Sequence, residues 1–131
     1  MIQYSVRLAL TLAVVVGIAG CATPLPEMSA DFLCVHYAYN NQSKSDKLPA
    51  IRDEIQRRKL LAENEQSAVE QGVLRIGMSR CAMLAVQGLP LAENRSTSAA
   101  GSYVQHVFNS PRGGKRVYVY TTNGRVTSWQ D

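Results

Sequence analysis

Near its C-terminus the chain reads Val117-Tyr118-Val119-Tyr120-Thr121-Thr122-Asn123-Gly124-Arg125-Val126. β-Branched and aromatic residues alternate up to Asn-Gly, the dipeptide most typical of a two-residue hairpin turn. Such a turn would place Thr121 opposite Val126, Val119 opposite Ser128 and Tyr118 opposite Trp129. The stretch therefore predicts an antiparallel hairpin, and the alternating segment 102–109 predicts a third strand beside it.

The two faces of this hairpin differ in chemistry. One face carries Val117, Val119, Thr121 and Val126, and the other carries Tyr118, Tyr120, Thr127 and Trp129. Only one face of a sheet in so small a domain packs on helices. We expect the valine face to be the core, which would leave a partly exposed aromatic strip. The reverse assignment, with the aromatic residues inside, stays open.

Helix signals precede the strands. Ser45 or Asp46 would cap a helix that ends at Leu60-Leu61, a second helix should run over 63–71 to Gly72, and Ser79 would cap a third that ends at Gly88. These signals predict an α+β fold with two or three helices packed on one face of a small three-stranded antiparallel sheet. We expect this domain to span residues 46–131.

The first 20 residues have the layout of a secretory signal peptide. Arg7 precedes a mostly apolar segment, 8–19, that is too short to span a bilayer. The next residues complete Ile18-Ala19-Gly20-Cys21, which resembles the lipobox of bacterial lipoproteins. The resemblance implies a diacylglycerol anchor with fatty-acyl chains such as palmitate on Cys21. Ala22, in place of Asp, implies sorting to the outer membrane, with the domain facing the periplasm. An ordinary signal peptide with an incidental cysteine is the alternative.

Residues 21–45 have the composition of a lipidated tether. Pro24 and Pro26 favour extended chain, and 40–45 is a polar loop by composition. The apolar segment 31–39 lies between them. We expect it to dock on the domain, held there by Cys34.

The cysteine count supports export. With Cys21 assigned to lipid, Cys34 and Cys81 remain, and in an oxidising compartment an even number predicts a disulfide. The competing interpretation is a metal site from Cys34, His36, Cys81 and His106. Cys-x-His lacks the ligand spacing of a zinc site, so we expect neither metal nor cofactor.

The charge pattern and the lack of catalytic motifs argue against two functional classes, nucleic-acid binders and enzymes. The formal net charge is +4, and basic residues such as Arg57 and Arg58 are interleaved with acids such as Glu54. The sequence shows neither the basic stripe nor the aromatic motif of nucleic-acid binders. It also lacks a carboxylate pair, a triad order or metal spacing. We expect a protein that is not an enzyme.

The order of these parts resembles the SmpA/OmlA (BamE-like) outer-membrane lipoproteins, as a divergent subgroup. The similarity rests on Ile76-Gly77-Met78-Ser79, on Gly88-Leu89-Pro90 and on the final hairpin, and it covers about 63–131 plus the lipobox. It implies an ααβββ domain. The founding members belong to the β-barrel assembly machinery and bind partner proteins and anionic lipid.

From the resemblance and the anchor we expect an envelope scaffold or an outer-membrane protein assembly accessory. The alternative is a membrane-anchored binder or inhibitor of an exported enzyme, since a similar ααβββ arrangement serves such inhibitors. In both cases we expect the aromatic strip to bind the partner, with nearby cations orienting an acidic surface or a lipid headgroup. The residues concerned are Tyr118, Tyr120, Trp129, Lys115, Arg116 and Arg125.

Overall fold

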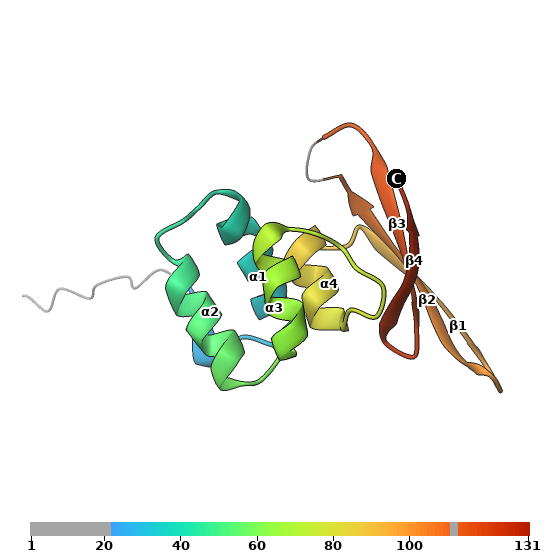
Figure 1. The fold of residues 1–131 in the computed structure, drawn as a ribbon, viewed down its shortest axis with the longest axis horizontal. Coiled ribbons are helices and arrows are strands. Elements are labelled where there is room, and N and C mark those ends of the chain that lie inside the picture. Colours follow the sequence, from blue (N-terminus) through green and yellow to red (C-terminus); the bar gives the residue numbers. More distant parts are fainter. Residues whose placement is uncertain (1–21, 111–112) are drawn as a thin grey trace, which may run out of the picture.

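A computed structural model describes residues 22–110 and 113–131. It is an α+β fold in which the helices lie on one side of an antiparallel sheet (Figure 1). The elements are η1 (Leu25–Glu27), α1 (Ala30–Gln42), α2 (Leu48–Arg57), α3 (Glu63–Gln71), α4 (Arg80–Gln87), β1 (Ala92–Ser98), β2 (Gly101–Asn109), β3 (Arg116–Thr122) and β4 (Arg125–Gln130). The predicted signal peptide and Cys21 lie outside the described residues. Within those residues, no helix has both the length and the apolarity that crossing a membrane requires.

Over the described residues the sheet has four strands in the order β1-β2-β3-β4, and four α-helices accompany it, so the predictions of three strands and of two or three helices are wrong. The strand that sequence reasoning missed is β1. Its sequence, AENRSTS, has no alternation of apolar and polar residues, because almost every residue of this edge strand is exposed. Without a buried face, a strand leaves no periodic signal.

Helix α1 occupies the segment that was expected to dock on the domain. Its N-cap is Ser29, whose hydroxyl accepts the Phe32 backbone N–H at 3.2 Å. Leu33, Cys34 and Tyr37 are fully buried, whereas Phe32 is exposed, so apolar residues lie on more than one side of the helix and its pattern is blurred. The helix continues through Asn40 and Asn41, where a polar loop was predicted.

Helices α3 and α4 follow the signals that predicted them, whereas α2 does not. Helix α3 has the predicted bounds and ends at Gly72, whose left-handed backbone, with a φ of 68°, is a conformation that glycine adopts without strain. Ser79 caps α4 as predicted, accepting the Ala82 N–H at 3.3 Å. Helix α2 begins after Lys47, which makes no side-chain cap hydrogen bond, so the prediction of Ser45 or Asp46 as its N-cap is wrong. The helix also ends earlier than expected, at Arg57, and Leu60 and Leu61 lie in the connection to α3.

The valine face of the hairpin is the core, as predicted. Val117, Val119 and Val126 are buried in one cluster with residues of all four α-helices, and Phe108 of β2 joins them. Thr121, on the same face, is buried as well. The alternative, with the tyrosines inside, is wrong.

The register of the final hairpin differs from the prediction beyond its first two pairs. Thr122 pairs with Arg125 and Thr121 with Val126, but a β-bulge follows, and Val119 then pairs with Trp129. Directly paired residues share a face of the sheet. Trp129 therefore lies on the valine side and not with Tyr118 and Tyr120, because the inserted residue reverses the alternation of β4.

The chain before α4 closes part of the edge of β4. The Gly77 N–H donates to the Val126 carbonyl at 2.7 Å, and the Val126 N–H donates to the Met78 carbonyl at 3.0 Å. Ser79 then donates its N–H and its hydroxyl to the buried Glu65 carboxylate at 2.7 and 3.0 Å. The Gly-Met-Ser stretch thus joins α3, α4 and the sheet.

A disulfide joins the first and last helices. The Sγ atoms of Cys34 in α1 and Cys81 in α4 are 1.99 Å apart, with a Cα separation of 5.4 Å. The two residues are 47 positions apart in sequence. A cross-link over a loop of this length removes entropy from the unfolded chain, worth about 3 to 4 kcal/mol.

We predict that Cys81→Ala lowers the melting temperature by more than about 10 °C, because a small domain loses several degrees per kcal/mol. Scanning calorimetry or thermal circular dichroism of the oxidised protein checks this. In the unreduced wild type, alkylating reagents should modify neither thiol. Ready alkylation of both cysteines would contradict the assignment.

Candidate functional site

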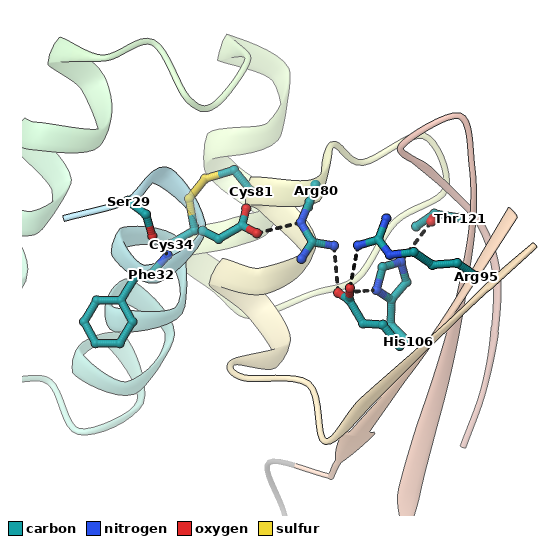
Figure 2. Close-up of polar contacts among 10 residues, drawn as sticks. Ser29, Phe32, Cys34, Arg80, Cys81, Arg95, His106 and Thr121 are labelled. Atoms are coloured by element: carbon teal, nitrogen blue, oxygen red, sulfur yellow. Dashed lines mark hydrogen bonds and ion pairs between the residues drawn. A yellow bond between two sulfur atoms is a disulfide. The ribbon is translucent and has the colours of Figure 1, made fainter. Parts of the chain in front are cut away.

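A polar network connects the helices to the sheet around the carboxylate of Glu93 in β1. Figure 2 shows Arg80, Arg95 and His106 of this network. Arg80 of α4 binds this carboxylate at 2.8 Å and Asp31 of α1 at 2.9 Å. His106 of β2 shares a hydrogen bond of 3.0 Å with Glu93 through Nδ1. Arg95 binds the second carboxylate oxygen at 2.8 Å. One carboxylate therefore holds groups from α4, β1 and β2.

The ionisation of the network follows from burial and charge. Burial acts to raise the pKa of Glu93, but the hydrogen bond and charge of Arg80 outweigh it, so this pKa is lowered. Burial lowers the pKa of His106, an effect that Glu93 offsets only in part. The charges of Arg80 and Arg95 lower it further. The network thus favours an ionised Glu93 and a neutral His106.

His106 also contacts Thr121, so that a hydroxyl, an imidazole and a carboxylate stand in line. The Nε2 atom lies 2.9 Å from the Thr121 hydroxyl, on the side of the ring away from Glu93. This is the order of groups that activates a hydroxyl nucleophile. However, His106 is 1% exposed and Thr121 4% exposed. A substrate in solution cannot reach the hydroxyl, and the arrangement is a packed structural link.

The cysteines and histidines of the alternative metal site do not come together as ligands. Cys34 and Cys81 are bonded to each other. His36 stacks on Phe32 on α1, whereas His106 belongs to the network in the sheet. Over 22–110 and 113–131, no group of three histidine, cysteine or acidic side chains has the geometry of a metal site.

The predicted binding residues separate into three places. Tyr118 and Tyr120 point to the side of the sheet that faces away from the helices. Trp129 and Lys115 instead line a groove of about 410 Å³, together with Leu74 and Gln87. This groove is at the end of β3 and β4 that is remote from the Asn123-Gly124 turn. The expected strip of Tyr118, Tyr120 and Trp129 does not exist as one surface.

The two remaining cations also differ in surroundings. Arg125 donates to the Gly77 carbonyl at 3.2 Å and lies 3.8 Å from the Glu65 carboxylate, so it is partly engaged within the fold. Arg116 is exposed at the start of β3, opposite Asn109. The register gives both Arg116 and Arg125 strand positions on the face that carries Tyr118 and Tyr120, but only Arg116 is without these contacts to Gly77 and Glu65.

We call that side of the sheet the outer face. The register assigns to its centre Ala92, Asn94, Ser96, Tyr103, Gln105, Val107, Tyr118, Tyr120, Thr122 and Ser128. None of these residues is charged, and no helix covers them (Figure 1). A shallow groove of about 330 Å³ runs over this face beside Tyr103 and Tyr120.

A chain of hydrogen bonds crosses the outer face from strand to strand. The Asn94 amide donates to the Gln105 side chain at 2.9 Å, and the Gln105 amide donates to the Tyr120 hydroxyl at 3.1 Å. These side chains from β1, β2 and β3 are held in place before any partner arrives. Such preorganisation reduces the entropy that binding would cost.

Sequence reasoning missed Glu93 as the centre of the network and Tyr103 as part of the outer face. Both omissions follow from the missing strand β1, since pairing β1 with β2 places Glu93 opposite His106 and Ser96 opposite Tyr103. A glutamate opposite a histidine at the same face of a hairpin was the available signal.

Comparison with protein-family models, with curated proteins and with solved structures finds no match to this chain.

We predict that the protein loses stability as the pH falls from 7.5 to 5. The folded pKa of His106 is lowered, so the unfolded chain binds the proton more readily. The stabilisation from neutral His106 is complete above the ordinary histidine pKa of about 6.5 and decreases as the pH falls through it. His106→Gln should flatten the pH dependence of the melting temperature.

The matched control is Gln105→Ala on the same strand, which removes no titratable group and should keep the wild-type slope. A His106→Gln protein whose melting temperature changes with pH as steeply as that of the wild type would contradict this role of the network.

Proposed function

We propose that this chain is a non-catalytic lipoprotein of the SmpA/OmlA (BamE-like) type. It is anchored in the outer membrane through Cys21, faces the periplasm and acts as an envelope scaffold or outer-membrane protein assembly accessory. It would bind a partner protein through the outer face of the sheet. The observation that carries the proposal is that an entire sheet face is tyrosine-rich, uncharged at its centre and uncovered by helices.

The composition of this face suits protein recognition. Tyrosine supplies a large contact area at low entropic cost, and asparagine, glutamine and serine supply adaptable hydrogen bonds. Tyr103 takes the place that the sequence assigned to Trp129. Arg116, at the edge of the face, would orient an acidic rim on the partner.

The position of the N-terminal residues supports this orientation. Arg58, after α2, donates to the carbonyls of Met28 at 2.6 Å and Leu25 at 2.7 Å, which fixes η1 against the helices. Element η1 therefore lies at the helical end of the molecule, away from the sheet (Figure 1). A lipid on Cys21, four residues before Leu25, would hold the helical end near the membrane and leave the outer face available to the periplasm.

We predict that Cys21→Ser leaves unprocessed precursor and abolishes labelling by a fatty-acid analogue, because the thiol is the acceptor of the lipid. Detergent phase partitioning of the two proteins checks this. A Cys21→Ser protein that still partitions and labels as the parent does would show that Cys21 carries no lipid.

We predict that Tyr120→Ala weakens capture of the partner by more than about 1 kcal/mol while leaving the melting temperature nearly unchanged. Val119→Ala is the matched control on the same strand. It should lower stability, because its side chain is completely buried. The measurements are affinity purification of the anchored protein from membranes and thermal unfolding of both variants.

Assembly-machinery components in the eluate would support the scaffold role, and a single periplasmic enzyme would indicate the inhibitor instead. If Tyr120→Ala captures partners as the wild type does, the outer face is not the binding site.

A further inference from the structure

The two edges of the sheet differ in whether another segment of the chain pairs with them. Gly77–Ser79 pair with the beginning of β4 and occupy part of that edge. Over the described residues, no chain segment pairs with the outer edge of β1. An open edge presents unpaired backbone groups that can take up a further strand.

The hydrogen-bond pattern identifies the open backbone groups. The Asn123 N–H donates to the Ser102 carbonyl at 2.8 Å, which shows that Ser102 turns its backbone towards β3. Because this direction alternates along a strand, Tyr103 and Gln105 turn theirs towards β1. Their partners on β1 are Ser96 and Asn94. On β1, Glu93, Arg95 and Thr97 alternate with these residues and therefore direct their backbone N–H and C=O groups outward, away from β2.

We infer that the β1 edge pairs, antiparallel, with β1 of a second copy of this chain, with the two-fold axis at Asn94. This proposal is independent of the function proposed above. In this register Glu93 of each copy lies opposite Arg95 of the other, and each such pair exchanges two backbone hydrogen bonds. The charges are therefore complementary on both sides of the axis. A two-fold axis at Arg95 would instead place two guanidinium groups opposite each other.

The Arg95 side chain can form an ion pair with Glu93 of the second copy. Glu93 holds Arg80 and His106 within its own copy, whereas Arg95 is mostly exposed and, among the described residues, has Glu93 as its one side-chain partner. It can reach Glu93 of the second copy without disturbing the contact of α4 with β1. Cross-strand pairs of opposite charge stabilise an antiparallel ladder.

The same register accounts for exposed leucines before β1. Leu89 is 60% exposed and Leu91 53% exposed. With the axis at Asn94, Leu91 lies opposite Thr97 of the second copy, and the end of the neighbouring hairpin would cover both leucines. Removing this apolar surface from water adds to the backbone hydrogen bonds.

The test is disulfide cross-linking of the full-length protein in its membrane, with two differently tagged copies expressed together. At the axis, two Asn94 residues form a close non-hydrogen-bonded pair with a Cα separation of about 4.5 Å, within disulfide range. Asn94→Cys should therefore give a dimer that contains both tags on a non-reducing gel.

Ser96→Cys is the matched control, since the two Ser96 positions would be about 13 Å apart along the strands and should not cross-link. Arg95→Glu in the Asn94→Cys background should reduce the dimer severalfold, whereas Arg75→Glu in the loop before α4 should not. If Asn94→Cys impairs folding, Ala92→Cys in one copy and Ser96→Cys in the other should cross-link instead, because these residues face each other in this register.

A dimer from Ser96→Cys alone would overturn the register. A folded Asn94→Cys protein that remains monomeric, or that cross-links only to a different protein, would overturn the pairing of two copies.

Discussion

The placement of the helices on the sheet depends on the contacts that the Glu93 carboxylate makes. It receives Arg80 from α4, His106 from β2 and Arg95 from its own strand. Arg80 also binds Asp31, and the Cys34–Cys81 disulfide ties α4 to α1 at the next position. A partly buried charge of this kind is stable only when its partners are complete. The network thereby adds a polar link to the apolar cluster between the helices and the valine face, and the outer face and the β1 edge stay uncovered by the described part of the chain (Figure 1).

The parts of the fold that local signals specify were predictable. Asn123-Gly124 fixed the first two pairs of the hairpin, Gly72 and Ser79 marked helix ends, and the even cysteine count led to the Cys34–Cys81 pair. Each of these signals acts within a few residues or depends on chemistry alone. The division of the hairpin into a valine face and a tyrosine face followed from alternation, and burial agrees with it.

The features that were missed depend on contacts between distant residues. The bulge in β4 places Trp129 on the valine side. The sequence Val126-Thr127-Ser128 contains no signal that predicts an inserted residue. Strand β1 forms because β2 offers it an edge, not because its own residues favour a strand. Glu93, His106 and Thr121 then meet only through the register of β1, β2 and β3, so the network could not be read before the strand was known. The surface proposed to bind partners changed for the same reason, with Tyr103 replacing Trp129.

The most direct test of this account is a double-mutant cycle between Arg80 and Glu93, measured by denaturant unfolding at neutral pH. Arg80→Met keeps the aliphatic stem and Glu93→Gln keeps the shape of the side chain, so each variant removes chiefly its charge. If Glu93 joins the layers, the free energies of unfolding should be coupled by about 1 kcal/mol or more, with the double variant less destabilised than the sum of the single ones. Additive effects within about 0.5 kcal/mol would contradict the account, because the two layers would then be held together without this contact.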